Sequence, residues 1–212
     1  MKQLFSVDGK LYKTLDIVSD ILLANMLFIM CALPLVTVGA SAIALWDVIY
    51  AVVHHEGIKV SSRFLTTFRS ALRRGTLAWF IIVGTASVML GIYWIFGSVT
   101  QGNQIILLVL LALCSLPILS CVYIFPLLAR YEMSVSRVLR TAVAVASHCV
   151  WESIAAVVLF LVIICGVPLY AHRFIFLWFF FAWGGTAYLQ SWFVLHALNQ
   201  WYPPDAQVQV KI

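Results

Sequence analysis

The chain has 212 residues, of which 64% are hydrophobic and 10% are charged, and its mean hydropathy is +1.03. Because a soluble surface needs far more polar cover, with about 25% charged residues, this composition excludes an ordinary soluble enzyme, a disordered chain and a nucleic-acid-binding domain. It predicts an all-α, polytopic transmembrane helical bundle, long enough for about five or six spans of about 20 residues each.

The first segment, residues 1–16, is polar and contains Lys2, Lys10 and Lys13. We expect it to lie in the cytoplasm, because basic segments flanking membrane spans remain on that side. It precedes an apolar stretch without a small-residue cleavage pattern, so the first span is expected to stay as an anchor.

The next segment, residues 17–53, is almost entirely apolar. It is too long for one straight span and slightly short for two. Pro34 and Gly39 interrupt it, and proline removes a backbone donor and disfavours helix at the residue before it. We therefore expect a short, broken hairpin made of one helix over residues 17–33 and another over residues 40–53.

A strongly basic segment follows at residues 54–75. Its apolar residues Phe64, Phe68 and Leu72 recur every fourth position, which places them on one face of a helix. This predicts an amphipathic helix in the headgroup layer of the membrane. Its basic residues are Lys59, Arg63, Arg69, Arg73 and Arg74.

Residues 75–129 contain no charged side chain, and one glycine- and polar-rich break lies at 97–103. We expect helices at 75–96 and 104–129, the second kinked by Pro117 and Pro126.

The last third of the chain begins with another segment of mixed polar and apolar residues. A second amphipathic segment is expected over 133–152, followed by spans at 153–170 and 174–198 and a polar tail at 199–212. No internal repeat or second domain is evident, so we interpret residues 1–212 as a single integral membrane domain.

The distribution of basic residues predicts the orientation. Both amphipathic segments, 54–75 and 133–152, should face the cytoplasm. The N-terminal lysines also favour the cytoplasm, which requires residues 17–53 to cross twice or re-enter. We predict six helical passes with both termini inside, and five passes is the alternative.

Two polar side chains in the broken hairpin are candidates for a binding site. Asn25 and Asp47 lie about 13 Å and about 12 Å from the break, so they should share a depth and could hydrogen-bond. Buried polar groups in a membrane either bind a substrate or proton, or hold helices together. The second interpretation is favoured here. Thr37, between Pro34 and Gly39, is expected to cap the second helix.

Charged residues form the candidate interaction surface. Arg63, Arg69, Arg73 and Arg74 belong to the first basic segment, and Arg130, Glu132, Arg137 and Arg140 to the second. The second group could form a cytoplasmic ion-pair cluster, although anchoring of helix ends is the favoured interpretation.

The sequence contains no recognisable catalytic or metal-binding pattern. The five cysteines show no CxxC spacing, and the five histidines are adjacent or scattered. No nucleophile has an identifiable base, and no phosphate-binding loop is present. We expect a protein that is not an enzyme and has no cofactor or metal.

Two blocks carry a family resemblance. NMLFIMCALPLVTVGASAIAL (Asn25–Leu45) and the basic segment after it resemble the opening of the YesL family, also called DUF624. FPLLARYEMSVSRVLRTA (Phe125–Ala142) resembles a second signature of that family. The resemblance implies a small polytopic protein of the bacterial cell membrane, associated with carbohydrate ABC importers.

Three functions are therefore considered. The leading hypothesis is a non-enzymatic accessory protein of uncharacterised activity that contacts lipid and the permease subunits of a sugar importer. The alternative is a small-solute carrier or substrate-binding subunit built around Asn25 and Asp47. A membrane enzyme is the least favoured.

Overall fold

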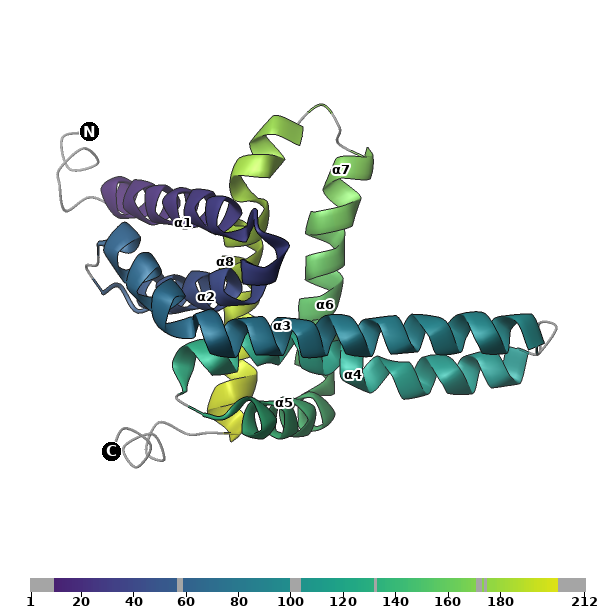
Figure 1. Ribbon diagram of the computed structural model, residues 1–212. Coiled ribbons are helices and arrows are strands. Elements are labelled where there is room, and N and C mark those ends of the chain that lie inside the picture. The colour runs from purple at the N-terminus through teal and green to yellow at the C-terminus, as the bar shows by residue number, and fades with distance from the viewer. Residues whose placement is uncertain are drawn as a thin grey trace.

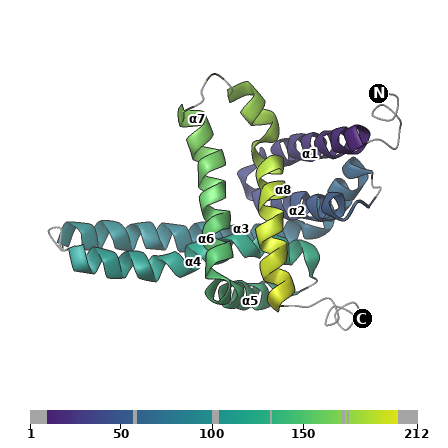
Figure 2. The ribbon, with the colours of Figure 1, turned by 180° about the vertical axis from the view of Figure 1, so that it is seen from behind.

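The structure is a computed structural model that describes residues 10–56, 59–99, 104–131, 133–170, 173 and 175–201. Within these ranges the chain is helical and contains no strand, which confirms the predicted all-α class (Figure 1). One helical hairpin projects sideways from the body and a second stands across it in both views (Figures 1 and 2).

The N-terminal hairpin is present as predicted. α1 spans Lys10–Ala32, a short 3-10 turn (η1) covers Leu35–Thr37, and α2 spans Val38–Val53. α1 and α2 run side by side in opposite directions (Figure 1). The break is at Pro34, as expected, whereas α1 begins well before the predicted residue 17.

Thr37 was predicted to cap α2, but its side chain binds the end of α1. It occupies the N-cap position just before α2, as predicted, but its side chain makes no capping bond there. Its Oγ1 instead donates to the carbonyl oxygens of Cys31 (2.6 Å) and Pro34 (2.8 Å). The last carbonyls of a helix lack partners within the helix, so Thr37 closes the end of α1.

α3 spans Val60–Val99 as one continuous helix of 40 residues. The predicted amphipathic segment and the span after it are therefore not separate elements. Gly75 does not interrupt the helix, because a glycine inside a helix costs only about 1 kcal/mol and is tolerated where packing requires it. α4 spans Gln104–Arg130 and includes both Pro117 and Pro126. The distal parts of α3 and α4 form the projecting hairpin (Figure 1).

The C-terminal half contains α5 at Val135–His148, α6 at Val150–Leu161 and α8 at Ile175–Trp201. Between α6 and α8 lie a π-helical turn (η2) at Val162–Gly166 and the short α7 at Val167–Tyr170. α6 and α8 pack against one another, and α5 lies across their lower end (Figure 2).

α2 is the central helix of the core. It contacts α1, α3, α4 and α8, and nearly all of its residues are buried. Its small residues Gly39, Ala40, Ser41 and Ala44 allow several neighbours to approach closely. Helices that satisfy their backbone groups internally and expose apolar side chains outward are the arrangement expected in lipid.

Four described helical segments are long and apolar enough to cross a membrane, namely Thr14–Ala32, Leu35–Val53, Val60–Ile95 and Val150–Tyr170. Large apolar side chains on them are strongly exposed, including Leu35, Leu90, Trp94 and Leu169. Such surfaces are favourable in hydrocarbon and unfavourable in water. The protein is therefore a polytopic helical membrane protein, and six passes remains a prediction.

Candidate functional site

A cluster of ion pairs joins α2 to α3. Arg63 donates from Nε to Asp47 Oδ2 (3.0 Å) and from Nη2 to Oδ1 (2.9 Å). Thr67 donates to Asp47 Oδ2 (2.6 Å), and Arg63 Nη1 also binds Glu56 Oε2 (2.7 Å). Both carboxylate oxygens of Asp47 are therefore occupied by protein groups, in the two-point geometry that makes arginine–carboxylate pairs strong.

The chain reversal before α3 places Glu56 in this cluster. His55 has a positive φ of 54°, and its amide bonds the Val52 carbonyl (3.1 Å). The amide of Glu56 bonds the Ala51 carbonyl (3.0 Å). This pair of bonds is the Schellman motif, which ends a helix and usually has glycine at the position of His55.

Two glycines set the distance between α2 and α3. A Cβ atom on Gly75 would lie 2.5 Å from the backbone nitrogen of Ala40 and 2.7 Å from the carbonyl carbon of Gly39. Real Cβ atoms essentially never come this close, so the two backbones are in direct contact. The crossing fixes where the first turns of α3 lie along α2, and it thereby aligns Arg63 with Asp47.

The buried face of α3 differs from the predicted one. Val60, Phe64, Ala71 and Ala78 are buried at roughly heptad spacing, whereas Leu72 is 37% exposed. The apolar side of the basic segment therefore packs on protein. It is not free to enter the headgroup layer as predicted, because α2 already covers it.

Asn25 is fully buried and binds the backbone of α8. Its Nδ2 donates to the carbonyl of Phe179 (3.1 Å), and its Oδ1 accepts from the amides of Trp183 (3.0 Å) and Gly184 (2.9 Å). Phe179 and Trp183 are four residues apart, the spacing at which a helix pairs its own carbonyl and amide. The Asn25 side chain thus binds backbone groups of one turn of α8, which continues as an unbroken helix through this point.

Gly184 permits this contact between α1 and α8. A Cβ at this position would lie 2.9 Å from the carbonyl oxygen of Ile21 and 3.2 Å from Cβ of Asn25. The two helices can approach only because position 184 carries no side chain.

The predicted hydrogen bond between Asn25 and Asp47 is wrong. Asn25 is bound to α8 and Asp47 to α3, and the three hydrogen bonds of each are made to other groups. Both side chains hold neighbouring helices together, which agrees with the favoured interpretation from the sequence. A role in substrate binding stays a prediction for both.

Arg130 lies between two aromatic rings at the end of α4. Its guanidinium carbon is 5.9 Å from the centroid of the Tyr50 ring and 5.8 Å from that of Tyr131. The hydroxyl of Tyr50 donates to the carbonyl of Pro126 (3.3 Å), so α2 and α4 are joined at this point. These contacts anchor the end of α4, as the sequence favoured for Arg130.

The other arginines of the predicted ion-pair cluster lie on α5. Arg137 and Arg140 are exposed on α5, and no ion pair from either to another described residue occurs. Glu132 lies outside the described residues. An ion pair with Glu132 therefore stays a prediction.

α5 exposes a basic face and buries an apolar one. Val138, Ala142, Val145 and Ala146 are buried against the rest of the bundle. α5 packs mainly on α4 and also contacts α3. We define the basic surface as the arginines of α3 and α5 that are at least partly exposed and lie outside the ion-pair cluster: Arg69, Arg73, Arg74, Arg137 and Arg140.

A second polar group lies where α5 meets α6 and α8. The Cys149 thiol is 3.4 Å from Gln200 Oε1, and Gln200 Nε2 is 3.0 Å from His196 Nε2. His196 lies 4.0 Å from Glu152. Burial raises the pKa of the Cys149 thiol, and the nearby Glu152 carboxylate raises it further. The thiol is therefore held in its neutral, weakly nucleophilic form.

No candidate metal site is found in the described part of the chain, where no three or more His, Cys, Asp or Glu residues lie close enough together to bind an ion.

Thr67 and Glu56 were not predicted as partners in the ion-pair cluster. A signal for Thr67 was present, because it lies one helical turn after Arg63 and so shares its face.

Comparison with known families agrees with the resemblance in the first block. Residues 21–93 match the family described as "Protein of unknown function, DUF624". The match covers the second half of α1, all of α2 and α3 up to residue 93, and so includes the ion-pair cluster and the Gly39–Gly75 contact. No curated protein and no solved structure matches the chain.

Proposed function

We propose that this chain, which matches DUF624 over its first three helices, is a non-enzymatic accessory protein of the bacterial cell membrane that docks on a carbohydrate ABC importer. The importer association is what the resemblance to the YesL family implies. In this proposal the basic surface faces the cytoplasm and contacts acidic side chains of the permease subunits.

The observation that supports docking is the combination of a covered apolar face and an exposed basic face on the same helices. The apolar sides of α5 and of the start of α3 are buried in the bundle. Arg69, Arg73, Arg137 and Arg140 remain exposed, and the described residues provide no acidic partner for them. Exposed charges of one sign steer and orient a partner of the opposite sign.

The state of the Cys149 thiol supports a non-enzymatic role. Cys149 contacts Gln200, which in turn contacts His196 and so occupies the position between the thiol and the imidazole. Its raised pKa disfavours the thiolate that catalysis would need. The solute-carrier alternative has less support, because the polar atoms of Asn25 and Asp47 already bind protein groups.

Co-purification tests the docking proposal. A tagged copy is isolated in mild detergent from cells that contain the importer, and the permease subunits are measured in the eluate. The double variant Arg137→Glu, Arg140→Glu should lose them. Ser147→Glu adds a negative charge to an exposed position of the same helix and is the matched control.

Each result of the co-purification either supports or contradicts docking. Retention with Ser147→Glu and loss with the double arginine variant, at equal membrane levels, would support docking through the basic surface. Isolation of the wild-type protein without any permease would contradict the importer association. Equal retention by all variants would contradict the basic surface as the contact.

A further inference from the structure

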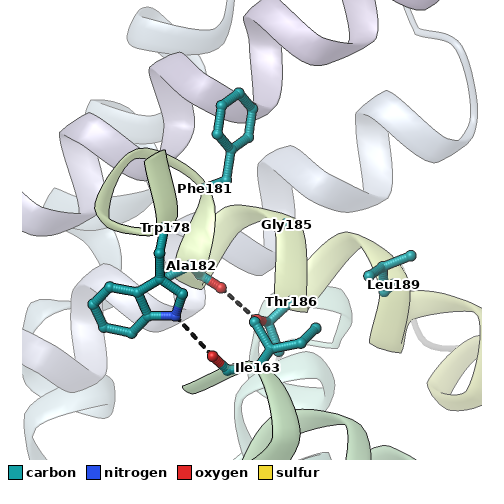
Figure 3. Close-up of a pocket in the computed structure, with 7 residues that line it drawn as sticks. All are labelled: Ile163, Trp178, Phe181, Ala182, Gly185, Thr186 and Leu189. Atoms are coloured by element: carbon teal, nitrogen blue, oxygen red, sulfur yellow. Dashed lines mark hydrogen bonds between the residues drawn. The ribbon is translucent and has the colours of Figure 1, made fainter. Parts of the chain in front are cut away.

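The π-helical turn between α6 and α7 borders an apolar cavity of about 180 Å³ (Figure 3). The lining residues come from this turn and from the facing part of α8 and are Ile163, Trp178, Phe181, Ala182, Gly185, Thr186 and Leu189. A π-turn adds one residue to a helical turn and is found mostly at functional positions. We propose that this cavity binds an acyl chain of a membrane phospholipid.

The two polar side chains at the cavity have no free donor for a polar ligand. Trp178 Nε1 donates to the carbonyl of Ile163 (2.7 Å), and Thr186 Oγ1 donates to the carbonyl of Ala182 (Figure 3). Both donors are therefore satisfied within the protein. A sugar would leave most of its own hydroxyl groups without partners here, which disfavours its binding.

The position of the cavity favours an acyl chain as its ligand. Ile163 lies within Val150–Tyr170, a segment long and apolar enough to cross a membrane. Exposed apolar side chains surround the opening, with Val162 55% exposed and Leu189 51% exposed. In such a span hydrocarbon surrounds the side chains, and an apolar space of roughly 150 Å³ is large enough to hold a benzene molecule.

Gly184 and Gly185 are adjacent in α8 but have different neighbours. Gly184 contacts α1, where a Cβ would clash with the carbonyl of Ile21. A Cβ on Gly185 would meet only Cβ of Phe181, at an ordinary 3.8 Å. Gly185 therefore contributes empty space to the cavity, and a larger side chain at this position can fill it without moving the backbone.

The empty space beside Gly185 provides the test of this proposal. Gly185→Leu fills the cavity, and Gly84→Leu is the matched control, because a Cβ on Gly84 in α3 has nothing within 4 Å. Both substitutions exchange a helical glycine for leucine, so their gain in helix propensity is the same. The proteins are placed in vesicles of phosphatidylethanolamine that contain phosphatidylglycerol with a photoreactive diazirine on one acyl chain. Labelled residues are mapped by mass spectrometry.

We expect labelling of the wild-type protein to concentrate on the cavity residues, Ile163 and Leu189 among them. Gly185→Leu should reduce it roughly tenfold, because the leucine excludes about two methylenes of the acyl chain from the site. Gly84→Leu should leave it unchanged. Thr186→Val should also retain labelling, because the hydroxyl that it removes serves only the helix.

Equal labelling of wild type and Gly185→Leu would overturn the proposal, as would even labelling along every exposed apolar side chain, which is the pattern of ordinary boundary lipid. Absent lipid labelling together with protein crosslinks from position 189 would identify the cavity as a protein interface instead. If Gly185→Leu proves less stable than Gly84→Leu, Ile163→Phe fills the same cavity from the other helix and replaces it. The result does not depend on the importer.

Discussion

The backbone of Gly39 in α2 lies directly against the backbone of Gly75 in α3, with no side chain from either residue between them. Close backbone approach at small residues is the main way in which helices associate in lipid, where burial of apolar surface contributes little. This contact is the point about which the first half of the molecule is organised. It sets the register in which Asp47 meets Arg63.

The first prediction concerns this crossing. Gly75→Ala should destabilise the protein by about 1–3 kcal/mol, because the added methyl group has to displace the backbone of α2. Gly84→Ala, in the same helix but without neighbours, should stabilise it by about 0.5–1 kcal/mol. Thermal unfolding of the purified variants in one detergent measures both. Equal midpoints would show that the two backbones do not touch.

The second prediction concerns the ion-pair cluster. Asp47→Asn should cost about 1–3 kcal/mol, because it leaves the half-buried Arg63 without a charged partner on α2. Glu56→Gln should cost at most about 1 kcal/mol, since the Glu56 side chain is 52% exposed and that pair is screened by water.

Denaturant titrations of the two variants compare these costs. A larger loss for Glu56→Gln than for Asp47→Asn would contradict the assigned importance of the α2–α3 pair. Loss of solute uptake by Asp47→Asn at unchanged stability would favour the solute-carrier alternative.

The third prediction concerns the link between α1 and α8. Asn25→Leu should destabilise the protein by about 1–3 kcal/mol, because it removes the acceptor that the amides of Trp183 and Gly184 share on α1. Hydrogen exchange measured on peptides that cover residues 179–186 should then become faster relative to the rest of α8. Ser19→Ala removes an exposed hydrogen bond from the same helix and should change neither measurement. Unchanged exchange at these amides would contradict the role of Asn25 in holding α8.

The fourth prediction concerns the turn before α3. His55→Gly should stabilise the protein by about 1 kcal/mol, because glycine adopts a positive φ without steric cost. His54→Gly should bring no such gain, as the φ of His54 is −85°. A fall in the unfolding midpoint with His55→Gly would mean that the imidazole itself contributes more than the backbone strain costs.

The fifth prediction concerns the number of passes. With six passes and the N-terminus inside, a cysteine at position 2 should react with an impermeant maleimide only after the cells are opened. Lys59→Cys should behave in the same way, and Gly102→Cys should react in intact cells. Labelling of position 2 from outside, with position 59 still protected, would establish five passes.

Much of the helical layout followed from local pattern. Proline at position 34, the glycine- and polar-rich break at 97–103 and the apolar runs between them are local signals, and the observed helices end close to them. The two amphipathic segments were also found from periodicity. Their apolar faces were assigned to lipid, however, because one sequence cannot distinguish an apolar surface that meets lipid from one that meets another helix.

The sequence by itself therefore determined that this protein is helical, belongs in a membrane and reverses direction at particular places, because hydropathy and helix breaking act within about 20 residues. Only the tertiary structure decided that Asn25 binds α8, that Asp47 binds Arg63 and that Gly185 opens a cavity beside a π-turn. These pairings depend on which helices cross and at what register. Backbone contacts between small residues far apart in the chain fix both, and such contacts leave no local pattern.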